Sequence, residues 1–304
     1  MRICRDDKPT ANSKGELTWL PGPTKHVRDN TTIREIASST NSLVKTFRRA
    51  LKEGVTREGW IAVEGPLGVA EALNAGGGAP NVCISRVRSV LVARAAIAKF
   101  GNLLRRLPAD VEVTQIPDRL FDQVAQTNTP QGIAALVEIK RPTVETVLGI
   151  PNVLLVATFT LQDPGNLGSI LRSTEALGGN AVITTKSSVS PFNSKVVRSS
   201  GGAIFRLPVF QGLEPDELLS RLRQAGIRTI ATERHASTPL TALDLRGPSA
   251  LLIGREAGGL EKDILQKACD GAAIPVRTGI DSINAAAAAA ILLYEAARQR
   301  SFRY

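Results

Sequence analysis

The second half of the chain repeats short, almost uninterrupted apolar runs, each separated from the next by a segment long enough for a helix. These runs lie at residues 153–157, 181–184, 207–210, 228–231, 250–253 and 272–274. Strands that are buried on both faces show continuous apolar runs, whereas half-exposed strands alternate apolar and polar residues. The repeat therefore predicts an α/β fold in which helices cover both faces of a parallel sheet.

The first half is less regular, and it predicts a small α/β domain. Leu43, Val44, Phe47 and Leu51 have helical spacing, which predicts a helix over 41–51. Further strands are expected at 60–63, 81–85, 111–115 and 133–139, and further helices at 66–73, 93–107 and 120–125. We expect four units, in chain order a disordered or loosely ordered extension (1–30), the first domain (31–140), a linker (141–152) and the second domain (153–304).

The net charge indicates an anionic partner. The 304 residues carry a formal charge of +10, which favours a nucleic acid over an acidic small molecule. Between Glu175 and Glu214 there is no acidic residue, and four basic residues fall there: Lys186, Lys195, Arg198 and Arg206. Taken alone, this stretch fits a surface that follows phosphates and an ordinary solvated face equally well.

Several classes of protein are disfavoured. No apolar stretch reaches the 18 or more residues of a membrane span, and no signal peptide pattern occurs, so we expect a cytoplasmic protein without membrane contact. Cys4, Cys83 and Cys269 are odd in number and far apart, which predicts buried or surface thiols. His26 and His235 are expected at the surface, so no metal site is expected. The phosphate loop and the dinucleotide fingerprint are both missing from the sequence.

Three polar constellations follow predicted strands of the second half. They are Asn166-x-Gly168-x-x-x-Arg172, Gly254-x-Glu256-x-x-Gly259, and Asp281-Ser282-Ile283-Asn284 after Pro275. Ligands of parallel α/β sheets bind outside the carboxyl ends of the strands, so these segments should converge. Each also has a structural interpretation: Asn166 and Ser282 could cap helices, Arg172 could form a surface ion pair, and the glycines could make an ordinary turn.

Together with Arg198-x-Ser200-x-Gly202 and Ile274-Pro275, these constellations resemble the successive motifs of the SpoU (TrmH-like) RNA ribose 2'-O-methyltransferases of the SPOUT superfamily. The first half resembles the substrate-recognition domain of that family, which is similar to a small ribosomal RNA-binding protein, through residues 41–45, 64–66 and 129–135. The chain departs from the family pattern at Ala257, Val276 and in the triplet 283–285.

The resemblance implies a deep trefoil knot near the C-terminus, S-adenosylmethionine as methyl donor, RNA as substrate, and a homodimer with Arg172 acting in the partner's site. It implies catalytic roles for Asn166, Arg172, Glu256, Ser282 and Asn284. It implies cofactor contacts for Thr232, Glu233, Gly254, Glu256, Gly259, Ile274, Ile283 and Asn284. RNA contacts are implied for Arg198, Ser200 and Ser282.

The leading hypothesis is a 2'-O-methyltransferase that acts on ribosomal RNA. Alternatives are a transfer RNA target, an enzyme that protects ribosomal RNA from an antibiotic, and a silent RNA-binding or ribosome assembly protein. Retention of the polar motif residues argues against the silent protein. The role of Arg172 stays open between general base and electrostatic anchor, because a guanidinium group is not normally deprotonated in proteins.

Overall fold

The computed structural model describes seven segments of the chain. They are residues 10–11, 17–18, 33–75, 83–233, 236–256, 258–278 and 282–302. Of the expected extension over 1–30, only β1 (Thr10–Ala11) and β2 (Leu17–Thr18), which pair antiparallel, are described, and the remainder lies outside the described residues. Within these segments no helix is both long and apolar enough to cross a membrane.

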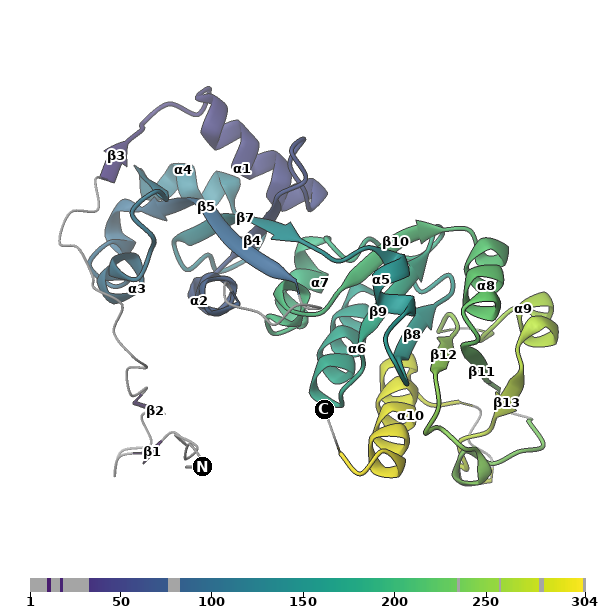
Figure 1. The fold of residues 1–304 in the computed structure, drawn as a ribbon. Helices are drawn as coiled ribbons and strands as arrows, with labels where there is room; N and C mark the ends of the chain where they lie inside the picture. Colours follow the sequence, from purple (N-terminus) through teal and green to yellow (C-terminus); the bar gives the residue numbers. More distant parts are fainter. Residues whose placement is uncertain are drawn as a thin grey trace.

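The first sheet has five strands in the order β3-β6-β5-β7-β4. Their bounds are Ile33–Glu35 for β3, Ile61–Glu64 for β4, Ile84–Ala93 for β5, Glu112–Ile116 for β6 and Ile133–Lys140 for β7. β3, β6 and β5 are parallel, while β7 runs antiparallel to both β5 and β4. The first half is therefore a mixed sheet flanked by helices (Figure 1).

Four α-helices belong to this half. They are α1 (Ser42–Glu53), α2 (Pro66–Asn74), α3 (Gly101–Arg105) and α4 (Asp118–Val124). α1 begins where the Asn41 side chain accepts from Leu43 N, buries Val44 and Phe47, and ends at Gly54, whose φ of 96° suits glycine. The predicted helix over 41–51 is thus confirmed.

The expected helix over 93–107 is wrong in its first part. β5 continues to Ala93, a 3₁₀ turn follows at Arg94–Ala96, and α3 begins only at Gly101. Residues 90–93 are buried and pair with strands on both sides. The strand expected over 81–85 therefore extends to Ala93, because the buried valines and leucine of this run fill a central strand, and the expected helix loses its first part.

The second sheet is entirely parallel, with the order β10-β9-β8-β12-β11-β13. The bounds are Leu154–Thr158 for β8, Ala181–Thr185 for β9, Val209–Leu213 for β10, Arg228–Thr232 for β11, Ser249–Ile253 for β12 and Asp270–Ala272 for β13. The predicted α/β class with a parallel sheet is confirmed. The strand order reverses between β8 and β12, which is where ligands of such sheets bind.

Helices cover both faces of this sheet. They are α5 (Val144–Leu148), α6 (Pro164–Ala176), α7 (Ser194–Ser199), α8 (Pro215–Gln224), α9 (Lys262–Lys267) and α10 (Ala285–Gln299), with 3₁₀ turns at Ala203–Phe205 and Leu240–Ala242. Leu154 and Val156 pack into one buried cluster with α6 and α10, whereas Leu155 and Ala157 pack into a second cluster with α8. Figure 1 shows α6 and α10 side by side.

Two expectations about the connections change. Residues 141–152, expected as a linker, contain α5, whose Val147 is buried in the cluster beneath α8. The sequence predicts a terminal helix over 282–300, whereas the helix begins at Ala285 and its cap is Asn284. Ser282 is therefore not the helix cap, because the side chain of Asn284 already accepts from the first free N–H groups.

The thiols follow the prediction where they are described. Cys83 is buried and Cys269 is exposed. Burial raises the pKa of the Cys83 thiol to about 11, against the opposing effect of Arg141. Cys4 and both histidines lie outside the described residues.

Candidate active site

The first constellation is built at the start of α6, directly after β8. The Asp163 side chain accepts from Asn166 N at 2.7 Å and so caps the helix, with Pro164 in its first turn. Asn166 is half-buried, and its side chain stays available for contacts beyond the helix. Gly168 is buried, and a Cβ there would lie 1.9 Å from Ser199 Oγ, so only glycine lets α7 approach.

Glu256 comes from the loop after β12, the neighbour of β8 in the sheet. Its Oε1 accepts from Asn166 Nδ2 at 2.9 Å and from Asp163 N at 3.1 Å. Two constellations that are 90 residues apart in sequence therefore meet at the point where the strand order reverses.

Asn284 brings in the third constellation. Its Oδ1 accepts from Ala286 N at 2.8 Å and Ala287 N at 3.2 Å, which caps α10. Its Nδ2 donates to Asn166 Oδ1 at 2.8 Å. Glu256, Asn166 and Asn284 thus form one hydrogen-bonded chain, here called the polar triplet, so these three catalytic candidates lie together.

The polar triplet has only one consistent direction. An ionised carboxylate can only accept, so Asn166 must turn its NH₂ group to Glu256 and its oxygen to Asn284. Asn284 must then use its own oxygen for the helix cap. After these bonds Asn166 retains one N–H and one lone pair, which is what a hydroxyl ligand would need.

The ionisation of Glu256 follows from the same contacts. Partial burial works to raise the pKa of this carboxyl, but hydrogen bonds from Asn166 and from its own backbone, Asp163 and Gln162 outweigh it, and the pKa is lowered. Glu256 is therefore an anion at neutral pH. It serves better to hold Asn166 than to take up a proton.

Arg172 and Ser282 are not part of the polar triplet. Arg172 is six residues after Asn166, about 240° further around α6, on an exposed stripe with Ser169 and Ala176. Its stem lies over Gly201, where a Cβ would be 3.5 Å from Arg172 Cδ. Ser282 is exposed, and within the described segments neither residue makes a side-chain hydrogen bond.

The residues predicted to contact RNA differ in their exposure to solvent. Arg198 is exposed on α7, but Ser200 is buried and its hydroxyl donates to Val197 O at 2.8 Å. The other basic residues between Glu175 and Glu214 form ion pairs with acidic side chains: Lys186 pairs with Glu214, Lys195 faces Asp163 at 4.0 Å, and Arg206 binds two glutamates. This stretch is not a continuous free phosphate surface.

The cofactor candidates lie at the carboxyl ends of β11, β12 and β13, which are neighbours. The loop after β12 turns back sharply, since a Cβ on Gly254 would lie 2.2 Å from the carbonyl carbon of Gly259. Gly258 and Gly259 are exposed with φ of 96° and 66°. Their backbone can therefore line a ligand directly.

The surrounding side chains complete this edge. Thr232 Oγ1 donates to Leu252 O at 2.9 Å, which holds the ends of β11 and β12 together. The Glu233 carboxylate lies over Gly271, at 3.2 Å from where a Cβ would stand. Ile274 and Ile283 are half-buried. A backbone-lined turn, a carboxylate and apolar side chains fit a cofactor that has both a nucleoside and a charged end.

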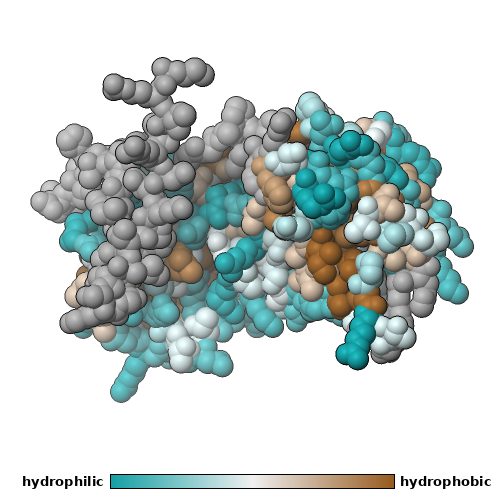
Figure 2. All heavy atoms as spheres, turned by 90° about the horizontal axis from the view of Figure 1, so that it is seen from below, coloured by the Kyte–Doolittle hydropathy of each residue, from teal (hydrophilic) through white to brown (hydrophobic). Residues whose placement is uncertain are grey.

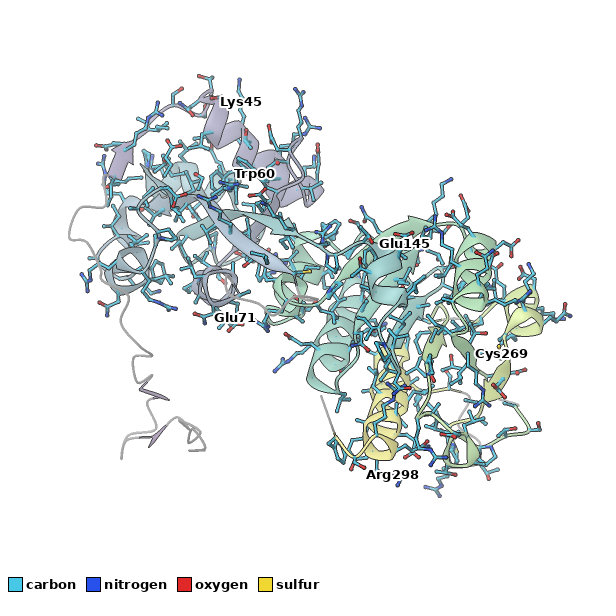
Figure 3. All side chains as sticks on the ribbon, viewed as in Figure 1. Lys45, Trp60, Glu71, Glu145, Cys269 and Arg298 are labelled. Carbon is cyan, nitrogen blue, oxygen red and sulfur yellow. The ribbon has the colours of Figure 1, made fainter. Side chains whose placement is uncertain are left out.

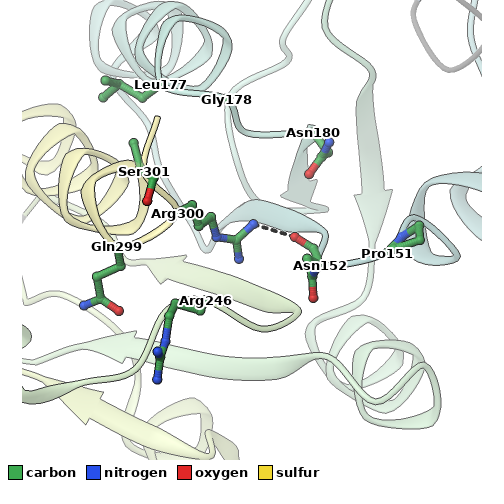
Figure 4. A pocket seen from close by; sticks show the side chains of 10 residues that line it. Pro151, Asn152, Leu177, Gly178, Asn180, Arg246, Gln299, Arg300 and Ser301 are labelled. Carbon is green, nitrogen blue, oxygen red and sulfur yellow. Dashed lines mark hydrogen bonds between the residues drawn. The ribbon is translucent and has the colours of Figure 1, made fainter. Parts of the chain in front are cut away.

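A cavity of about 540 Å³ lies at the opposite, amino edge of the same sheet. Figure 4 shows Arg300 at its centre, reaching Asn152 O. The same guanidinium donates to Leu245 O at 2.9 Å and Gly247 O at 2.7 Å. This cavity therefore belongs to the anchoring of α10. Across the described segments no cluster of side chains could hold a metal ion.

Comparisons with known proteins identify the family of the chain. A model of the SpoU rRNA methylase family matches residues 153–294. A 23S rRNA (guanosine-2'-O-)-methyltransferase of Xylella fastidiosa is 36% identical over 200 residues, which are 63% of this chain and 79% of that protein. This chain belongs to the SpoU rRNA methylase family.

Other members of the SpoU rRNA methylase family match more of the chain. A 23S rRNA (uridine-2'-O)-methyltransferase of Streptomyces viridochromogenes is 32% identical over 67% of this chain and 73% of its own length. The structure of the SpoU methyltransferase AviRb of that organism, in complex with S-adenosylmethionine, is 28% identical and superposes with a TM-score of 0.73 over 86% of this chain and 98% of that one.

Family membership confirms the predicted enzyme class and cofactor: this SpoU-family chain is an S-adenosylmethionine-dependent RNA 2'-O-methyltransferase. Sequence reasoning missed one participant, Asp163, which caps α6 and donates its backbone N–H to Glu256. Its signal was present, because an acidic residue before proline at a helix start is a typical cap.

Proposed function

We propose that this enzyme methylates a ribose 2'-hydroxyl in ribosomal RNA. The observation that carries the proposal is the polar triplet at the strand-order reversal, in which one donor and one acceptor of Asn166 are not used by any other described residue. The relatives named as 23S rRNA methyltransferases support ribosomal over transfer RNA. Such a target would place the enzyme in the cytoplasm, where ribosomes are assembled.

Within this proposal Asn166 binds the target hydroxyl, and Glu256 and Asn284 hold its amide in position. When bound, S-adenosylmethionine supplies an electrophilic methyl group. Residues at the ends of three strands would hold it: Thr232, Glu233, Gly254, Gly259, Ile274 and Ile283. Asn284 and Glu256, at the border of this cradle, would keep the two reactants adjacent, so positioning supplies much of the rate.

Arg172 would complete the site of a second subunit, and this requires a homodimer. Ile291 and Tyr294 on α10 and Phe302 after it are 40%, 54% and 44% exposed, and the rings of Tyr294 and Phe302 are 5.8 Å apart. Figure 2 shows apolar side chains gathered among hydrophilic neighbours on the face seen from below. Such a patch favours coverage by a partner, and α10 packs beside α6, which presents Arg172.

Further parts of the proposal concern the fold. We place a deep trefoil knot near the C-terminus, an arrangement that is rare in proteins. Pro239 and Ala273 form a parallel β-bridge, and Leu240 N donates to Ala273 O. These contacts hold the segment after β11 beside the segment after β13, which supports the knot. We assign residues 31–140 to RNA recognition, in a ribosomal-protein-like domain. Ser282 and Arg198, both exposed, would contact RNA phosphate.

The decisive experiment maps 2'-O-methyl groups in the RNA of a deletion strain and its parent. The proposal expects one ribosomal RNA position to lose its methyl group and the purified enzyme to restore it on an unmodified transcript. Loss of a transfer RNA mark instead would contradict the ribosomal target. An enzyme that binds S-adenosylmethionine in calorimetry but methylates neither RNA would contradict the proposed substrate.

A further inference from the structure

The two sheets meet at a close-packed junction that the proposed chemistry does not use. On the side of the first sheet stand α1, α2 and the start of β5, and on the other side stand α6, α7 and the 3₁₀ turn at Ala203–Phe205. Buried residues of both halves belong to one continuous hydrophobic cluster. Figure 3 labels Glu71 on this side of α2.

Arg206 joins three elements of this junction. Its guanidinium donates to Glu71 Oε2 at 2.6 Å, and it binds both carboxylate oxygens of Glu175. Glu71 lies on α2, and Glu175 lies on α6, three residues after Arg172. All three side chains are between 25% and 32% exposed, so water screens these pairs less than ordinary surface pairs.

The charges of this bridge are firmly held. Hydrogen bonding to Glu175 raises the pKa of Arg206, burial opposes the rise, and Glu71 adds to it. Arg206 is therefore a permanent cation with two anionic partners, one from each half of the chain. A planar guanidinium suits such a double contact because its donors form a fixed fork.

The two halves approach closely at two glycines of the junction. Gly202 is buried with a φ of 91°, and a Cβ there would lie 2.6 Å from Glu71 Oε2. Gly54, at the end of α1, would place a Cβ 2.2 Å from Phe192 O. Cys83 N donates to Arg206 O at 3.1 Å. Because glycine alone fits at both contacts, the halves approach at backbone distance.

We propose that the Glu71–Arg206–Glu175 bridge is a positioning device that fixes the first half on α6, so that RNA held by the first half meets the methylation site at one distance. The inference rests on the proposed function, since it assumes that the first half binds RNA. These are positioning residues and touch no reacting atom. Their effect should appear in substrate binding, because only a large RNA can contact both halves together.

The chain offers a matched pair of variants. Glu71→Gln removes the charged contact that Arg206 makes across the junction. Glu175→Gln removes the charged contact that the same arginine makes within the second half. The probes are an unmodified full-length 23S rRNA transcript, radiolabelled S-adenosylmethionine, and small-angle scattering of the RNA-free protein. We expect Glu71→Gln to raise KM for the transcript about tenfold, with kcat within about twofold and a larger radius of gyration.

Glu175→Gln should leave KM and the scattering profile at their wild-type values, and both variants should bind S-adenosylmethionine as the wild type does. Equal KM values for the two variants would overturn the inference, and so would an unchanged scattering profile for Glu71→Gln. If Glu71→Gln does not fold, Glu71→Asp replaces it, because it keeps the charge but withdraws the carboxylate by one carbon. It must then show the same selective rise in KM.

The wild type separates this inference from the proposed function. If the wild type methylates no ribosomal RNA transcript, the proposed function fails, and the scattering comparison alone decides whether the bridge fixes the two halves. If the wild type is active and Glu71→Gln has the same KM, the bridge has no positioning role although the function stands.

Discussion

The two edges of the parallel sheet use polar groups in opposite ways. At the carboxyl edge, Asn166 is held by Glu256 and Asn284 but retains a free donor and acceptor. At the amino edge, Arg300 directs its three nitrogens to three backbone carbonyls around a cavity of about 540 Å³. The cavity thus lies at the edge where the hydrogen-bond donors of the central side chain are already used.

The proposed site is therefore recognised by its unused hydrogen-bonding capacity and not by a cavity. An arginine whose donors all bind main-chain oxygens fixes structure, and its own burial lowers its pKa without removing its charge. A carboxamide held on one side and open on the other can bind a ligand without reorganising. Variants at the two edges should therefore separate activity from stability.

The largest effect is expected from Arg172→Ala. If Arg172 stabilises charge at the partner's site, turnover should fall by on the order of 100-fold or more, while S-adenosylmethionine affinity measured by calorimetry stays within about threefold. Mixing this variant with an inactive Asn166→Ala variant should restore part of the activity through mixed dimers. Near-normal turnover of Arg172→Ala alone would remove the residue from the mechanism.

Asn284→Ser tests whether the hydrogen bond from Asn284 to Asn166 contributes to turnover separately from the helix cap. Serine still caps α10, but it is too short to donate to Asn166, so kcat should fall about tenfold while the free energy of unfolding changes by less than about 0.5 kcal/mol. Asn193→Ser is the control, because Asn193 caps α7 by accepting from Lys195 N and touches no part of the polar triplet. Equal kcat values for the two variants would exclude a role for the triplet.

Arg300→Met tests the amino edge. Three carbonyls lose a charged donor, so chemical denaturation should show a loss of about 2–4 kcal/mol, with kcat per folded molecule unchanged. Arg246→Met is the control, since Arg246 lines the same cavity but is exposed and, among the described residues, pairs with Asp244 alone; its denaturation midpoint should stay near that of the wild type. A lower kcat for folded Arg300→Met would mean that the edges are not separable.

The smallest effect concerns pH. The pKa of Glu256 is lowered in the folded protein, so its contribution to stability is present above the unfolded-state pKa and is lost only as the pH falls through the folded-state value. Between about pH 6 and pH 8 the activity profiles of the wild type and Glu256→Gln should therefore have parallel shapes. An acidic limb that disappears in Glu256→Gln would instead identify Glu256 as a base.

The sequence predicted the parts of the fold that repeat locally. The apolar runs predicted the parallel sheet, and the order of the constellations predicted that Asn166, Glu256 and Asn284 would converge, because the ends of parallel strands share an edge. The start of the helix expected over 93–107 was misassigned, and the strand expected over 81–85 was too short, because a buried apolar run can belong to a central strand or to a helix.

Long-range pairing could not be predicted. The spacing of Arg206 fits a phosphate contact and an ion pair equally well, and its partner Glu71 is 135 residues away. The bond of Ser200 is local, since its hydroxyl donates to Val197 O, but the motif gave no sign of it either. A side chain in a motif carries no sequence sign of whether its polar atoms are already satisfied.

The long-range contacts at the two ends of α10 affect when the enzyme can fold during its synthesis. Asn284, the N-cap of α10, donates to Asn166, which lies 118 residues earlier in the chain. Arg300, at the other end of the helix, donates to Asn152, which lies 148 residues earlier. Contacts between residues so far apart in sequence form late in folding, because a long segment must lose conformational entropy before the contact can stabilise it. During synthesis the polar triplet cannot close until residue 284 has left the ribosome, so the triplet forms only after both sheets have emerged.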